Sequence, residues 1–253
     1  MKPFPLLLAG LTLIGMVGTS VSAQDGGWRL FGTTPRENPY DEPLVTDRPD
    51  FTEASSTVGR GVVQLETGYT YSYHDDESTG DISHSHSGPE MLYRIGIADP
   101  IELRIAWNHQ WDRVDSGPFA LNSDGAQDLY FGAKLALRDE EGLRPEQAVI
   151  LQGTAPTGDD DYTTGSTEFG INYLYSWSLP NDWGLGASTG FDTNTAGSDE
   201  FLEWHQSVAV GIPLSDSVSV YVEYFGIYTH GQAVETNEHY VNGGFAWLVG
   251  YNV

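Results

Sequence analysis

The residues best suited to chemistry are charged side chains that recur at alternate positions along short segments. Arg94 and Arg104 flank one short turn, and Glu102 lies two residues before Arg104 on the same side of an extended chain. Opposite charges gathered in this way can select a solute at a constriction, or can fill a narrow interior with salt bridges. The sequence leaves both interpretations open. The candidate inward-facing charges are Glu66, Glu90, Arg94, Glu102, Arg104, Asp128, Lys134, Arg138, Glu168, Glu203 and Glu223.

A second candidate site lies upstream, in the segment TDRPDFTE at residues 46–53. Asp47, Arg48 and Asp50 can pair with charges of the opposite sign, and Phe51 can serve as an apolar anchor. If this segment folds back onto the charged positions, we expect it to act as a plug or gate. The alternative is a tail that stays outside the folded body.

Other constellations give weaker indications. His84 and His86 point the same way on an extended segment, as two zinc ligands can, but exposed histidines are the simpler interpretation. Acidic clusters such as Asp159–Asp161 suit Ca²⁺ or Mg²⁺, yet none has EF-hand spacing. Ser207 and His205 lie on one face without a G-x-S-x-G motif or an evident third member. We therefore expect no catalytic residues, no cofactor and no specific metal site, with divalent cations as an open option at the acidic loops.

Segments that alternate between apolar and polar residues must position these charges. In Gly61–Tyr73, Val63, Leu65 and the tyrosines share one side, while Gln64, Glu66 and Gly68 share the other. Ten such segments recur, and a segment with an apolar side opposite a charged side suits a strand between lipid and a polar lumen. The predicted strands are residues 61–73, 90–97, 101–107, 128–138, 147–154, 168–179, 183–192, 202–212, 218–228 and 240–249.

The predicted connections alternate between long and short. Residues 74–89 and 110–127 are long, whereas Ala98-Asp99-Pro100 and Pro180-Asn181-Asp182 are tight turns. Outer-membrane barrels have short periplasmic turns and longer outer loops, and a soluble β-sandwich has no such rule. We therefore predict an all-β, transmembrane, antiparallel up-and-down β-barrel. Ten strands are visible, and a further hairpin would give about 12 in the complete protein.

The beginning of the chain predicts export. Residues 1–23 have a basic start at Lys2, an apolar run and a small-x-small site ending at Ala23, which is the pattern of a secretory signal peptide. We divide the chain into this signal, a polar arm at residues 24–60, and a barrel at residues 61–253 that we expect to be incomplete at its C-terminal end. Cleavage near Ala23 would deliver the protein to a Gram-negative outer membrane.

The charge balance limits the partners. The chain carries a net charge of −25, and no Lys or Arg follows Arg144. Nucleic acid is excluded as a partner, because its recognition needs basic patches. We expect contacts with outer-membrane lipid and lipopolysaccharide, and with a small-molecule solute. The chain has no Cys, so neither a lipidated Cys nor a disulfide is available.

Several motifs in order resemble a known family. They are TDRPDFTE (46–53), VQLETGYTY (63–71), TAPTGDDD (154–161) and SVSVYVEYFGIY (217–228). Together they resemble outer-membrane transporters grouped as a MetA-pathway phenol-degradation family, common in planctomycetes and other Gram-negative bacteria. The resemblance implies an outer-membrane β-barrel related to channels for hydrophobic compounds. It favours a passive channel for small hydrophobic or aromatic solutes. The alternatives are a structural or adhesive barrel acting through its acidic outer loops, and a lipase-like barrel enzyme.

Overall fold

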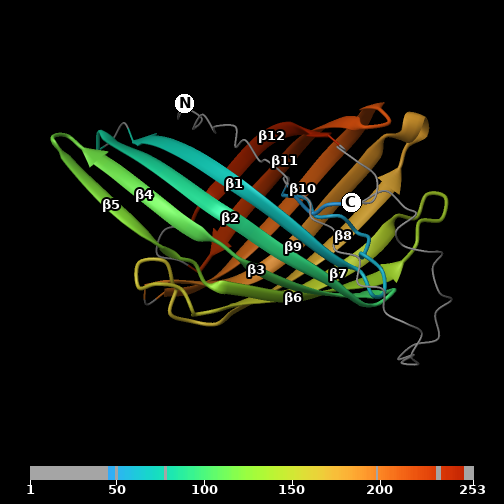
Figure 1. The fold of residues 1–253 in the computed structure, drawn as a ribbon, viewed down its shortest axis with the longest axis horizontal. Helices are drawn as coiled ribbons and strands as arrows, with labels where there is room; N and C mark the ends of the chain where they lie inside the picture. The colour runs from blue at the N-terminus through green and yellow to red at the C-terminus, as the bar shows by residue number, and fades with distance from the viewer. Residues whose placement is uncertain (1–44, 49–50, 77–78, 198, 232–234, 248–253) are drawn as a thin grey trace.

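A computed structural model describes residues 45–48, 51–76, 79–197, 199–231 and 235–247 (Figure 1). The predicted signal peptide, the arm before Val45 and the candidate Asp50 lie outside the described residues. Within the described part of the chain, no helix has the length and apolar character needed to cross a membrane.

The described residues form one sheet of twelve antiparallel strands, which confirms the all-β, up-and-down prediction. A turn of 3-10 helix, Pro180–Asp182 (η1), joins two of them. The strands are Val63–Asp76 (β1), Asp81–Ala98 (β2), Ile101–Trp107 (β3), His109–Ser116 (β4), Phe119–Ala126 (β5), Leu129–Arg138 (β6), Glu146–Ala155 (β7), Glu168–Ser178 (β8), Gly184–Ala196 (β9), Asp199–Ser215 (β10), Val218–His230 (β11) and Asn237–Trp247 (β12).

Strands β3 and β4 are two halves of one longer strand path, and β5 and β6 are two halves of another. Strand β2 pairs with β3 through Met91–Ala98 and with β4 through Asp81–Ser87, and β3 and β4 pair in turn with β6 and β5. The breaks fall at Asn108 and at residues 127–128. Pro89 lies in β2 at the same level, where it can donate no ladder hydrogen bond. The twelve strands therefore follow ten paths, the number expected from the alternation.

Two of the predicted long loops are wrong. Residues 74–89 and 110–127 are mostly strand, because β1 continues to Asp76 and β2 begins at Asp81, and β4 and β5 meet at Gly117-Pro118. Residues 74–89 are almost all polar, and residues 110–127 mix apolar and polar side chains on both faces, so the hydrophobic pattern that marks a half-buried strand is missing. The β4–β5 hairpin projects at the left of Figure 1, alongside the ends of β1 and β2.

The sheet curls, with β1–β3 passing in front of the strands β8–β12 (Figure 1). Burial on its two faces is the reverse of that in a soluble protein. Arg94, Arg104 and Lys134 are among the largest fully buried side chains, whereas Val222 on the other face is 60 % exposed. A small apolar cluster of Ala148, Ile150 and Leu174 also lies on the inner face. Strand β7 turns Ala148 and Ile150 to this face, since Ile150 lies opposite Lys134 of β6.

Candidate functional site

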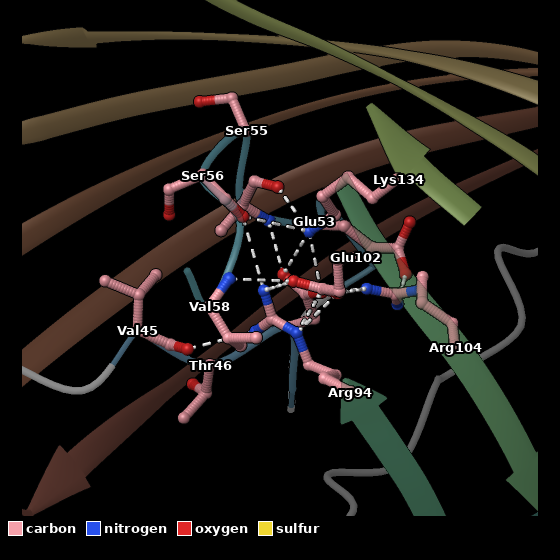
Figure 2. A network of polar contacts seen from close by, with 12 residues as sticks. Val45, Thr46, Glu53, Ser55, Ser56, Val58, Arg94, Glu102, Arg104 and Lys134 are labelled. Atoms are coloured by element: carbon pink, nitrogen blue, oxygen red, sulfur yellow. Dashed lines mark hydrogen bonds and ion pairs between the residues drawn. The ribbon is translucent and has the colours of Figure 1, made fainter. Parts of the chain in front are cut away.

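The candidate site is formed by residues 45–48 and 51–60, hereafter the arm, on the charged inner face of the curled sheet. Its contacts reach strands far apart in the sheet: Glu66 in β1, Lys134 in β6, Ser176 in β8 and Glu223 in β11. Strands so distant along the sheet can share one short segment only because the sheet curls around it. Figure 2 shows the arm backbone amid side chains from β2, β3 and β6.

Asp47 is the centre of the arm's first half. Its carboxylate accepts hydrogen bonds from Lys134 Nζ at 2.8 and 3.0 Å and from Arg104 Nη1, and it lies 3.3 Å from Arg94 Nε. The same carboxylate accepts a bond from the amide of Ala54 at 2.9 Å, which folds the arm into a compact turn. Burial alone would raise the pKa of Asp47, but Lys134, Arg104 and Arg94 outweigh it and hold the pKa far below its ordinary value.

A second layer of bonds fixes the three cations. Arg94 pairs with Glu102 through two bonds of 2.8 and 2.9 Å and with Glu66 at 3.1 Å. Arg104 pairs with Glu102 at 3.0 Å and with Glu53 of the arm. Three cations thus meet four carboxylates, counting Asp47, Glu53, Glu66 and Glu102. Because each buried charge has partners of the opposite sign, the network avoids the cost of an isolated buried ion.

Backbone groups of the arm complete this network. Arg94 donates to the carbonyls of Val45 at 3.0 Å and Ser56 at 3.3 Å, and Lys134 donates to Ala54 at 2.7 Å. In the other direction, Val58 donates its amide to Glu102 at 3.0 Å. Wall side chains therefore satisfy arm backbone groups that would otherwise be buried without partners. These contacts lie at the centre of Figure 2.

Two residues in the middle of the arm, Phe51 and Thr52, are bound by β10 and β11. Glu223 accepts bonds from the amides of Phe51 at 2.9 Å and Thr52 at 2.5 Å, and from the Thr52 hydroxyl at 2.6 Å. The Thr52 hydroxyl is also 2.7 Å from Ser207 Oγ. The Phe51 ring stacks on Phe225 with centroids 4.4 Å apart. Phe51 therefore contacts an inward-facing ring of β11, while its role as an anchor stays a prediction.

The arm enters at the end of the sheet that carries the β2–β3 turn. Thr57 donates to the carbonyl of Asp99 at 2.5 Å, and Gly61 donates to Gly96 at 2.8 Å. Gly96 has to be glycine, because a Cβ there would overlap the carbonyl oxygen of Gly59. This close approach brings the arm from the rim onto the inner face.

The structure brings together seven of the eleven predicted inward-facing charges against the arm. Arg48 pairs with Glu90, and the other six are Glu66, Arg94, Glu102, Arg104, Lys134 and Glu223. Whether they line a pore stays a prediction.

The other four predicted charges lie elsewhere. Asp128 precedes β6 and accepts bonds from the amides of Gly158 and Thr164, which holds the β7–β8 loop. Arg138 is exposed beyond a bulge at the end of β6, where the alternation changes phase. Glu168 and Glu203 line a cavity of about 450 Å³ beside the arm.

Sequence reasoning missed several arm contacts, because they involve serines or residues that were not among the predicted site residues. Glu53 binds Arg104, and Ser55 binds Glu146 at 2.7 Å and Ser176 at 2.6 Å. Ser176 and Ser207 have the same inward parity as the predicted charges, and that parity was the available signal.

The residues considered for catalysis and for zinc binding make other contacts in the structure. Ser207 Oγ bonds to Thr52 and Ser188, while His205 Nε2 contacts Asp192 at 3.1 Å; no bond joins His205 to Ser207 in the described residues. His84 and His86 bond instead to Tyr71 and Tyr69. Across the described ranges, no group of His, Asp and Glu is arranged to hold a metal ion.

Comparison with known families matches residues 46–253 to the family described as "Putative MetA-pathway of phenol degradation". The matched region begins at Thr46, so it includes the described arm as well as the whole sheet. Comparison with curated proteins finds no match.

Proposed function

The chain belongs to the MetA-pathway phenol-degradation family, and from that premise we propose that it is an outer-membrane barrel that passes small solutes and is gated by its own arm. The arrangement of the arm carries the proposal. A segment bound to inward side chains from β1 round to β11 lies where a solute would pass, beside a cavity of about 450 Å³. Passage is passive in this proposal, and hydrophobic or aromatic solutes follow from the family rather than from the site.

The outer face supports a location in lipid. Ile105, Leu151 and Phe191 are between 43 and 51 % exposed, while the charges on the opposite face are buried. A charged side chain facing lipid near the midplane would cost about 2–4 kcal/mol, so this distribution suits a membrane barrel. The expected signal peptide and a contact with lipopolysaccharide belong to the same proposal. Extraction that requires detergent, together with heat-modifiable gel mobility, would test it.

The absence of native Cys allows the gate to be tested with a reversible lock. Thr52 Oγ1 and Ser207 Oγ are 2.7 Å apart, so Thr52→Cys with Ser207→Cys places two thiols within reach of a disulfide. In planar bilayers we expect the oxidised double variant to conduct less than the same protein after reduction. Each single-Cys variant is the control and should not respond to reductant.

Two results would contradict the channel proposal. One is inserted protein that carries no current in any form, including a variant in which Asp47→Asn weakens arm binding. The other is a current that is the same in the oxidised and reduced double variant. The second result would favour the structural alternative, in which the filled barrel presents its projecting hairpins outside the cell.

A further inference from the structure

The cavity beside the arm has a chemical character of its own. Arm residues Asp47, Arg48, Phe51 and Glu53 form one side of it, and β8, β9 and β10 form another. From the residues of that second side, we infer that the cavity binds a small organic cation, such as an amine or guanidinium on a compact apolar body. This inference rests on the proposed channel and names the solute class that its vestibule takes.

The cations at this cavity are already paired. Arg48 is bound to Glu90, and Arg104 is bound to Asp47, Glu53 and Glu102. The charge of each guanidinium is therefore compensated, although Arg48 Nε and Arg104 Nε have no hydrogen-bond partner among the described residues. An anion would have to displace a buried carboxylate of the same charge.

In the described residues, no lysine or arginine pairs with the carboxylates of the other wall. Glu203 bonds to Asn194 Nδ2 at 3.2 Å, and Glu168 bonds to the amide of Thr195 at 2.8 Å and to the Thr154 hydroxyl. Asp192 bonds to Gln152 Nε2 at 2.8 Å and contacts His205. Moreover, Glu203 and Asp192 are direct cross-strand partners on β10 and β9. Like charges placed opposite one another destabilise a sheet, and a bound cation would relieve that repulsion.

Two buried atoms on the same wall also lack partners. Asn172 Oδ1 and His205 Nδ1 have no hydrogen-bond partner, although each residue is only 5 % exposed and lines the cavity. In the neutral tautomer that donates from Nε2 to Asp192, Nδ1 of His205 is an acceptor, as is the amide oxygen of Asn172. An ammonium or guanidinium supplies the N–H donors that these two acceptors can use.

Size and lining indicate an organic cation rather than a bare ion. The volume of about 450 Å³ lies within the range of small-molecule sites. Phe51, Leu92 and Ala106 add an apolar surface to the cavity. In the described part of the chain, the acidic groups do not converge as metal ligands do.

Three probes that share one ring and differ in charge test the inference. Tyramine, 4-ethylphenol and 3-(4-hydroxyphenyl)propionate are titrated calorimetrically into the full chain in detergent. We expect tyramine to bind about tenfold more tightly than the propionate, with the neutral phenol between them. Glu203→Gln should remove most of that preference and leave the binding of 4-ethylphenol unchanged. Glu200→Gln, an exposed acid on the opposite face of β10, is the matched control and should change neither.

Three results would overturn the inference: equal binding of the three probes, tighter binding of the propionate, or displacement of tyramine by millimolar CaCl₂ at constant ionic strength. Uptake into liposomes separates this outcome from the proposed channel. If neutral and charged solutes enter at equal rates, the channel stands and the cation site fails. If tyramine binds in a Glu203-dependent way but no solute enters liposomes in any form, the cation site stands and the channel fails.

Discussion

On the inner face of the sheet, β1 to β6 carry cations and carboxylates together, whereas β7 to β12 carry carboxylates without any lysine or arginine. In the first wall, Arg94, Arg104 and Lys134 have little exposure and several partners each. In the second, Glu203 faces Asp192 across the strands. A buried network in which every charge has partners of the opposite sign fixes the position of a segment. Loss of any member leaves its partners as buried charges without a counter-charge. An uncompensated pair lowers stability and leaves an attractive field available to a solute. The arm bridges the two walls, so breaking the compensated network and removing one carboxylate of the uncompensated pair should have effects of opposite sign.

The largest effect is expected at Asp47, on the compensated wall. Asp47→Asn removes the charge shared by Lys134, Arg104 and Arg94, and leaves three buried cations with too few partners. We expect a loss of about 3–5 kcal/mol in the free energy of unfolding, the usual cost of breaking a buried ion pair. Urea titration in detergent, followed by tryptophan fluorescence, measures it.

The control for Asp47 is Glu200→Gln, an exposed acid outside the network. It should leave the unfolding midpoint within experimental error. A midpoint for Asp47→Asn equal to that of the control would show that the network does not hold the arm, and the comparison of the two walls would lose its basis.

A backbone contact rather than a charge gives the next largest effect. In Gly96→Ala, the new methyl group meets the Gly59 carbonyl, so the base of the arm must move. Overpacking of this kind costs about 1–3 kcal/mol. We expect faster proteolysis within residues 45–60, with the sheet kept intact by circular dichroism. Gly211→Ala is the matched control, because a methyl group there has no atom within 4 Å. Equal cleavage rates for the two variants would contradict the close approach seen at Gly96.

Alternation in the sequence predicted much of this arrangement, since parity alone put Glu66, Arg94, Arg104, Lys134 and Glu223 on one face. Alternation failed wherever the odd and even positions of a segment did not differ in hydrophobicity. The β4–β5 hairpin mixes apolar and polar residues on both faces, so its strands were predicted as a loop. A bulge at the end of β6 changed the phase before Arg138. Such local shifts depend on pairing with the next strand, which one segment cannot reveal.

The arm shows a different limit of sequence reasoning. Its charges suggested partners, but contacts through backbone amides, such as those of Phe51 and Thr52 with Glu223, have no signature in residue type. The open choice between a plug and a tail could be addressed only by the positions of these groups in the curled sheet.

Glu223 binds the arm from the wall that lacks cations. We expect its substitution to lower the free energy of unfolding by less than the substitution of Asp47. Glu223→Gln keeps the side-chain shape but replaces one charged acceptor with a donor, which weakens the bonds from Phe51 and Thr52. We expect a loss of about 1 kcal/mol in stability and looser arm binding. Hydrogen exchange of the Thr52 amide should quicken, while that of the Val58 amide, bound to Glu102, should not. Equal acceleration at both amides would show that the arm binds as one unit rather than through two walls.

The smallest effect, and one of opposite sign, is expected for the like-charge pair. Glu203→Gln removes one of two carboxylates that face each other across β9 and β10, and Asn194 can still bond to the remaining amide oxygen. Cross-strand pairs contribute roughly 0.2–1 kcal/mol, so we expect a stabilisation of up to about 1 kcal/mol, measured by the same urea titration. High salt should shrink the difference from the unmodified protein, because the repulsion is screened. A loss of stability would mean that Glu203 is compensated after all, and that the two walls do not differ in the way their charges suggest.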